Sequence, residues 1–134
     1  MKRPAPQGAP ESAGRILVVD DSVVIRRLLC RTLSFFAYQV VEASDGWDAL
    51  TVLERDPAFD LLITDLQMPG MDGYTLVQRI RSNAALSAFP ILVLTGENID
   101  ASSGPPTGTQ GLISKPFSPP QLLASVRQLI AAAH

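Results

Sequence analysis

Cysteine and histidine are nearly absent from this 134-residue chain, which holds one of each. The single cysteine, Cys30, excludes an internal disulfide and fits a reducing cytoplasm, where we expect the protein to reside. Zinc is disfavoured because its usual nitrogen and sulfur ligands are scarce: His134 ends the chain, and Cys30 lies inside a helical pattern. A metal site in this chain would therefore have to use oxygen ligands.

Long apolar runs and an excess of positive charge are also missing. No apolar run approaches 18 residues, and the first residues contain no apolar h-region, so we expect neither a membrane span nor a signal peptide. The net charge of −2 disfavours nucleic acid or an anionic membrane as the main partner. Neither G-x-x-x-x-G-K-[ST] nor G-x-G-x-x-G occurs, so nucleotide binding has no support.

The sequence does contain a regular alternation of strand and helix patterns. Residues 1–13 are rich in Pro, Ala, Gly and Ser and are expected to form a disordered tail before one folded domain, 14–134. Short apolar runs without polar alternation indicate strands that are covered on both faces of a parallel sheet. Five such strands are predicted, at 16–20, 38–43, 61–65, 90–95 and 111–114. The alternation predicts an open parallel α/β sheet with right-handed crossovers.

Apolar residues at helical spacing separate most of these strands. The first helix is predicted to start after Ser22 as its N-cap, and the last to start at Ser118-Pro119. The first helix places these residues at helical spacing: Ile25, Leu28, Leu29, Thr32 and Phe36. The interval 96–110 is different, because it contains several glycines and prolines and no apolar stripe. We expect a short turn at most there, followed by an irregular loop.

Polar residues stand at the ends of four predicted strands. Asp20 and Asp21 come at the end of the first strand, Asp65 ends the third, Thr95 ends the fourth and Lys115 follows the fifth. Each alone is commonly a turn, cap or solvated residue, but ligands of open α/β sheets bind at this edge. Two carboxylates about 4 Å apart repel by ~4 kcal/mol at an effective dielectric near 20, so three acids require cations. Lys115 supplies one charge, and the oxygen donors suit Mg2+ as a second cation.

Four motifs in order then resemble one family. They are VVDDS (18–22), ITDLQMPGMDG (63–73), PILVLTG (90–96) and SKPF (114–117). From about Arg15 to its end, the chain resembles the receiver domain of two-component response regulators. The resemblance implies a flavodoxin-like, doubly wound, five-stranded parallel sheet. It also implies a phosphoacceptor switch of a bacterial two-component phosphorelay.

The resemblance assigns the nucleophile and the metal ligands. Asp65 matches the phosphoacceptor, which takes a phosphoryl group from a sensor histidine kinase, a phosphotransfer protein or a small phosphodonor. Asp20 and Asp21 match the acidic pair that holds Mg2+, together with Asp65 and the backbone carbonyl of Gln67. The chain is expected not to be an enzyme, although it would catalyse its own phosphorylation and dephosphorylation.

Further roles follow from the same resemblance. Lys115, Thr95 and Gly96 match positions that bind the phosphoryl group, and the Thr95 hydroxyl is implied to shift on activation. Gln67 and Glu97 match two positions beside the path of the hydrolytic water, so they are implied to set the lifetime of the phosphoryl group.

Two features depart from the family pattern. The family usually has Tyr or Phe three residues before the lysine, as part of its activation switch, but here Leu112 stands at that position. The fourth helix, part of the usual output face, is expected to be shortened or replaced by a loop within 96–110. In both respects the chain resembles some stand-alone receivers that are associated with sensor kinases.

The partners and the alternatives remain open at this point. Arg26, Arg27 and Arg31 on the first helix are either a kinase-docking surface, as the resemblance implies, or a solvated basic face. The downstream partner is an unknown protein, and no output domain is expected after residue 134. The alternatives are a phosphorylation-independent interaction domain, a receiver fragment of a hybrid kinase, or a Mg2+-dependent aspartyl phosphohydrolase. The last requires a second acid where Gln67 stands.

Overall fold

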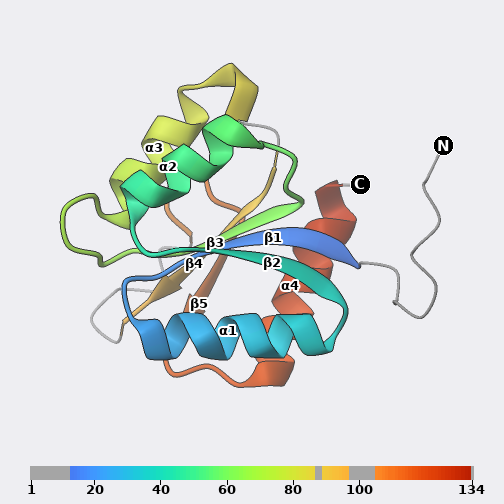
Figure 1. Ribbon diagram of the computed structural model, residues 1–134. Helices are drawn as coiled ribbons and strands as arrows, with labels where there is room; N and C mark the ends of the chain where they lie inside the picture. The colour runs from blue at the N-terminus through green and yellow to red at the C-terminus, as the bar shows by residue number, and fades with distance from the viewer. Residues whose placement is uncertain (1–12, 87–88, 97–104, 134) are drawn as a thin grey trace, which may run out of the picture.

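In a computed structural model, which describes residues 13–86, 89–96 and 105–133, five parallel strands form one sheet. The order across the sheet is β2-β1-β3-β4-β5, the strand order of the flavodoxin-like fold, so the predicted fold class is confirmed (Figure 1). The strands are β1 (Gly14–Val19), β2 (Tyr38–Ala43), β3 (Leu61–Asp65), β4 (Ile91–Thr95) and β5 (Gly111–Ser114).

Two strands, β1 and β4, have boundaries that differ from the prediction. β1 begins at Gly14 instead of residue 16, because Gly14 and Arg15 pair with Tyr38 and Gln39 of β2. It ends at Val19, which leaves Asp20 as the first residue of the following turn. β4 begins one residue after the proline at position 90. Proline has no N–H for the sheet, which accounts for this boundary.

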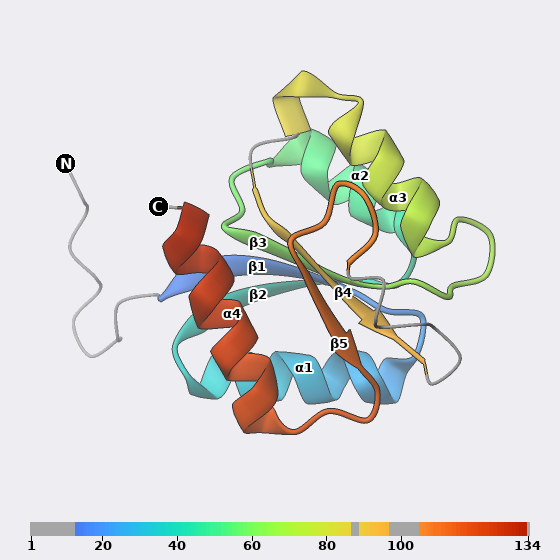
Figure 2. The same ribbon diagram turned by 180° about the vertical axis from the view of Figure 1, so that it is seen from behind.

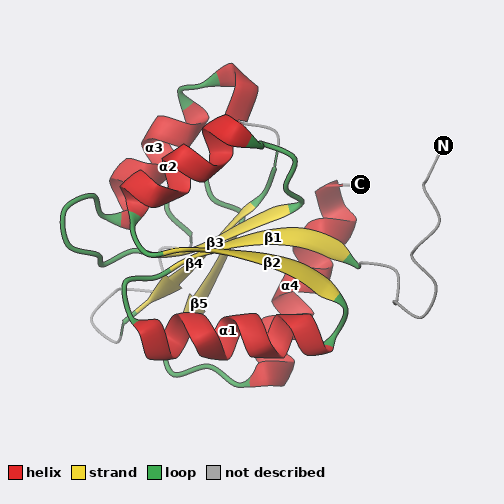
Figure 3. Ribbon diagram, viewed as in Figure 1, coloured by secondary structure: helices red, strands yellow, loops and turns green. Residues whose placement is uncertain are grey.

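Helices cover both faces of the sheet, as expected for a parallel sheet of apolar strands (Figures 2 and 3). The described helices are α1 (Val23–Phe35), α2 (Gly46–Arg55), α3 (Gly73–Arg81), the short 3-10 helix η1 (Ala84–Leu86) and α4 (Pro119–Ala133). α2 and α3 pack on one face around a core that includes Leu53 and Leu76, and α1 and α4 pack on the other around Leu29 and Val126. Two apolar cores therefore hold the sheet between them.

Side chains of the predicted kind begin the first three helices. Ser22 Oγ accepts the N–H of Ile25, Asp45 Oδ1 accepts the N–H of Asp48, and Asp72 Oδ1 accepts the N–H of Thr75. Each cap directly follows the loop at the carboxyl end of a strand. The caps therefore fix where each helix starts relative to that edge of the sheet.

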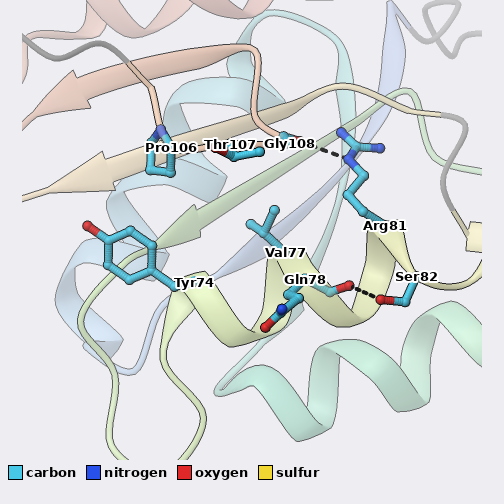
Figure 4. Close-up of a pocket in the computed structure, with 8 residues that line it drawn as sticks. All are labelled: Tyr74, Val77, Gln78, Arg81, Ser82, Pro106, Thr107 and Gly108. Carbon is cyan, nitrogen blue, oxygen red and sulfur yellow. Dashed lines mark hydrogen bonds between the residues drawn. The ribbon is translucent and has the colours of Figure 1, made fainter.

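The segment before β5 packs against α3 instead of forming a helix over the described residues 105–110. Arg81 of α3 holds it: Nε donates to the Gly108 carbonyl at 2.8 Å, and Nη2 donates to Gln110 Oε1 at 2.9 Å. A groove of about 580 Å3 lies between α3 and this segment, with Tyr74 and Pro106 at one end and Arg81 at the other (Figure 4). The rest of the interval, 97–104, lies outside the described residues.

No described helix combines the length and the apolar character that crossing a membrane requires.

Candidate functional site

The three acids predicted at the strand ends lie together at the carboxyl edge of the sheet. Asp20 directly follows β1, Asp21 is next in the turn, and Asp65 ends β3. One carboxylate oxygen from each acid lies within 4.8 Å of those of the other two. Asp20 is fully buried and Asp65 nearly so, whereas Asp21 is exposed. Because β1 and β3 are neighbours in the sheet, the topology itself brings these acids together.

Lys115 reaches the acids from the end of β5. Its Nζ donates to Asp65 Oδ2 at 2.9 Å and to Asp20 Oδ2 at 3.4 Å, and its peptide bond to Pro116 is cis. Burial alone would lower the pKa of Lys115, but the hydrogen bond to Asp65 and the charges of both acids outweigh burial and raise it. Lys115 therefore stays protonated at neutral pH and offsets one negative charge of the cluster.

Asp20 is the most deeply buried of the acids. Burial raises its pKa, and the nearby charge of Asp65 acts in the same direction. The N–H of Ser22, which donates to Asp20 Oδ1 at 2.9 Å, and the charge of Lys115 oppose this rise. Three carboxylates with one ammonium leave two negative charges, so the cluster matches a divalent cation in charge.

The loop after β3 holds Asp65 against the start of α3. The N–H of Gln67 donates to Asp65 Oδ1 at 3.1 Å, and Gly70 has a φ of +78°, which favours glycine. Gly73, the first residue of α3, packs against the backbone that follows Asp65: a Cβ there would lie 2.7 Å from Leu66 Cα. Glycine at position 73 is therefore what lets α3 begin so close to Asp65.

Thr95 and Gly96 close the site from the end of β4. Thr95 is fully buried, and its Oγ1 donates to the Gly96 carbonyl at 2.7 Å. A Cβ on Gly96 would lie 3.8 Å from Oε1 of Gln67, so the Gln67 side chain faces Gly96 across the site. These contacts bring the predicted residues of the β3 and β4 ends to one place.

Comparisons with known proteins agree with this geometry. A family model described as the response regulator receiver domain matches residues 16–127. The chain belongs to this family. A probable transcriptional regulator ycf27 of Cyanophora paradoxa is 41% identical over 118 residues, which are 87% of this chain and 48% of that protein. The chemotaxis response regulator CheY4 of Vibrio cholerae has a TM-score of 0.79 and 32% identity, with 90% of this chain and 99% of that chain covered.

A receiver domain from a histidine kinase is also similar. The receiver domain of a signal transduction histidine kinase from Syntrophus aciditrophicus has a TM-score of 0.81 and 30% identity, over 90% of this chain and 92% of that chain. The chain spans about half the length of the curated relatives it matches. Receiver domains are phosphoacceptor switches that interact with histidine kinases or phosphotransfer proteins. That this domain binds no nucleic acid stays a prediction.

The acid cluster fits the cation that receiver domains bind. Its donors are carboxylate oxygens, the ligands that a hard ion such as Mg2+ prefers. One of the three acids is exposed, which leaves that side of the cluster open to solvent and to water ligands. The predicted residues Asp20, Asp21 and Asp65 can therefore hold a divalent cation together.

The switch position, where Leu112 stands in place of the usual aromatic, lies in the described part of the receiver domain. Leu112 is partly buried and packs with the core on the α2–α3 face, next to Val93 of β4, so an aliphatic side chain occupies the position of the usual aromatic. Thr95 lies two residues beyond Val93 and therefore on the same face of the sheet. Glu97 lies outside the described residues.

Sequence reasoning missed one residue that contacts the site. The sequence pattern groups Arg26 with Arg27 and Arg31 on a docking or solvated face, but the Arg26 side chain is only 13% exposed. Its Nη1 donates to the Asp20 carbonyl at 2.7 Å. Helical spacing puts Arg26 three residues before Leu29 and seven before Leu33, which are both buried, and this spacing is the signal that the arginine turns inward.

Proposed function

We propose that this receiver domain takes a phosphoryl group on Asp65 and thereby changes its affinity for a partner protein. The observation that carries the proposal is the contact of 2.9 Å between Asp65 and Lys115, beside two further acids. A strand-end carboxylate with a fixed ammonium and room for a divalent cation is what phosphoryl transfer requires of a protein.

The proposed reaction uses the Asp65 carboxylate as the nucleophile. A carboxylate oxygen attacks phosphorus and forms a P–O bond, while the P–N bond of a phosphohistidine or the P–O bond of an acyl phosphate breaks. The leaving group keeps the electron pair of the broken bond. Asp20, Asp21, Asp65 and the Gln67 carbonyl would hold Mg2+, which when bound would supply positive charge to stabilise the phosphoryl oxygens.

Three residues are proposed to bind the phosphoryl group after transfer. Lys115 stays at the site, and its ammonium donates to a phosphoryl oxygen instead of to the free Asp65 carboxylate. The Thr95 hydroxyl leaves the Gly96 carbonyl and donates to a second oxygen, with the Gly96 N–H beside it. Because Leu112 is not aromatic, the movement of Thr95 would pass to the partner surface without the usual aromatic rotation.

The exposed face of α1 is proposed to dock the kinase or phosphotransfer protein. A shallow pocket there is lined by Val23, Val24, Arg27, Leu28 and Arg31, and the helix contains no acidic residue. Exposed apolar residues flanked by arginines suit a partner helix with an acidic rim. The domain is proposed to act in the cytoplasm, where such donors meet it.

Loss of the phosphoryl group is proposed to be self-catalysed as well. Gln67 and Glu97 would control access of water to the phosphorus and so set the lifetime of the adduct. Autophosphorylation and autodephosphorylation make the chain a switch with its own chemistry, not an enzyme that turns over a separate substrate.

A second candidate is the same chemistry within a longer protein. The similarity to a histidine kinase receiver domain and the half-length coverage of curated relatives favour it. The phosphoacceptor, cation site and docking helix would be the same in both cases. The two candidates differ in the partner that reads the phosphorylated state.

Intact-protein mass spectrometry tests the proposal. The wild-type chain is incubated with acetyl phosphate, once with Mg2+ and once with a chelator in place of Mg2+. The Asp65→Asn and Asp21→Asn variants are treated in the same way. We expect one added phosphoryl group that requires Mg2+, is absent from Asp65→Asn and forms more slowly in Asp21→Asn. A folded, Mg2+-binding wild type that gains no phosphoryl group would instead indicate a phosphorylation-independent interaction domain.

A further inference from the structure

Two neighbouring arginines on α1 lie in different environments. The side chain of Arg26 is 13% exposed, whereas that of Arg27 is 69% exposed. Both reach Oε1 of Glu42 on β2, Arg26 by Nε at 3.0 Å and Arg27 by Nε at 3.7 Å. Arg26 also donates from Nη1 to the Asp20 carbonyl at 2.7 Å. Arg26 thus joins α1, β2 and the end of β1.

The contact with the Asp20 carbonyl bears on the acidic pair. That carbonyl belongs to the planar peptide that links Asp20 to Asp21, so a bond to it fixes the plane from which Asp21 extends. The N–H of Asp20 is held separately by the Ala43 carbonyl at 3.3 Å, and its carboxylate by the Ser22 N–H. Arg26 therefore restrains the Asp20 carbonyl, which these two hydrogen bonds leave free.

The charge of Arg26 has a smaller effect than its geometry. A free guanidinium beside the cluster would repel a cation, but Glu42 pairs with this one and offsets its charge. The planar guanidinium can bond Glu42 and the Asp20 carbonyl at the same time, whereas a lysine ammonium is a point charge on a flexible stem. Removing Arg26 should therefore disturb the orientation of the Asp20 and Asp21 carboxylates more than it changes the electrostatic field at the cation site.

We propose that Arg26 is a positioning residue for the phosphorylation site, which holds the Asp20–Asp21 peptide so that both carboxylates face the cation. This inference rests on the proposed function, because it concerns the same Mg2+ site. It assigns to α1 a second task beside docking: one arginine of the helix orders the metal-binding turn, and the next remains at the surface.

Isothermal titration of MgCl2 into the full chain tests this role, with Arg27→Met as the matched control. Arg26→Met should raise the Kd for Mg2+ about tenfold, equivalent to about 1.4 kcal/mol. Arg27→Met, which removes the same charge near the same glutamate, should stay within about twofold of wild type. Arg26→Lys should fall between wild type and Arg26→Met, since lysine can keep one of the two bonds.

A second readout separates positioning from stability alone. If Arg26 positions the acids, phosphorylation of Arg26→Met by acetyl phosphate is slow at low Mg2+ and recovers towards the wild-type rate at saturating Mg2+. Urea unfolding in chelator shows whether the variant is folded. If Arg26→Met does not fold, Arg26→Lys against Arg27→Lys carries the same test, with weaker Mg2+ binding expected only for the former.

Three outcomes overturn the inference. A folded Arg26→Met with the wild-type Kd, or a tighter one, would show that the contact does not orient the ligands. Equal weakening in Arg26→Met and Arg27→Met would show a general charge effect. A wild type that does not bind Mg2+ would overturn this inference and the metal site of the proposed function together, whereas the first two outcomes leave that function intact.

Discussion

Lys115 shows how a single residue can stabilise the site before any cation binds. Its ammonium lies between two buried carboxylates, at 2.9 and 3.4 Å, and is itself only partly exposed. Without it, Asp20 and Asp65 would face each other with no ammonium between them. A buried charge that loses its partner is costly, although partial exposure of the lysine lowers the cost.

Replacing this lysine should therefore destabilise the Mg2+-free chain. Lys115→Met is expected to lower the free energy of unfolding by about 1–3 kcal/mol in chelator, because two buried acids lose their counter-charge. Added Mg2+ should restore more stability in this variant than in wild type. Urea denaturation with and without Mg2+ measures both effects, and Arg31→Met, an exposed arginine on α1, is the control. A free energy of unfolding that is unchanged in Lys115→Met would show that the ammonium does not stabilise the site.

Asp20 gives a prediction of opposite sign. Its pKa is raised above the ordinary value of 3.8 by burial, so ionised Asp20 costs stability in the folded chain. Below about pH 3.8 the acid is protonated in both the folded and the unfolded chain, and it has no effect. As the pH rises through the raised pKa, the folded chain must ionise the buried acid, and the cost reaches its full size.

Asp20→Asn should accordingly be more stable than wild type at pH 7 in chelator. The difference in stability between the variant and wild type should shrink as the pH falls. It should vanish where Asp20 is protonated in both the folded and the unfolded wild-type chain. With saturating Mg2+ the order should reverse, since only wild type keeps the full set of ligands. Urea denaturation across pH checks this, and a variant that is less stable at pH 7 without Mg2+ would count against it.

At the scale of one element, α1 has two overlapping apolar stripes. The predicted stripe combined Leu28, Leu29 and Phe36, but the structure buries Leu29 and Leu33 and leaves Leu28 44% exposed. Adjacent residues on a helix point about 100° apart, and here Leu29 points into the core whereas Leu28 lies at the solvent edge of that face. Apolar character alone did not show which leucine turns inward, because the exposed stripe is also apolar and includes Phe35 at 82% exposure.

The two leucines make a matched pair for a stability test. Leu29→Ala should lower the free energy of unfolding by about 2–5 kcal/mol, since it opens a cavity in the core between α1 and the sheet. Leu28→Ala should change it by less than about 1 kcal/mol, because the side chain is half solvated. Chemical denaturation of the two variants decides the register of α1, and equal losses would show that the assigned face is wrong.

At the scale of the whole molecule, the parallel topology made the site predictable. Apolar strands with acids at their ends were sufficient to place Asp20 and Asp65 at one edge, and the structure brings them within reach of Lys115. The sequence could not show the direction of the Thr95 hydroxyl, which donates to the Gly96 carbonyl in this structure. It also could not show that Arg26 reaches the Asp20 carbonyl. Both depend on the fit of one element against another, which a linear pattern does not contain.

The proposed function depends on Asp65 as the residue that carries the phosphoryl group. After reaction with acetyl phosphate and Mg2+, borohydride reduces an aspartyl phosphate to homoserine, and peptide mass spectrometry locates the changed residue. We expect homoserine at position 65 alone, and none when Mg2+ is chelated. Homoserine at Asp20 or Asp21, or an adduct that leaves no homoserine at position 65, would contradict it.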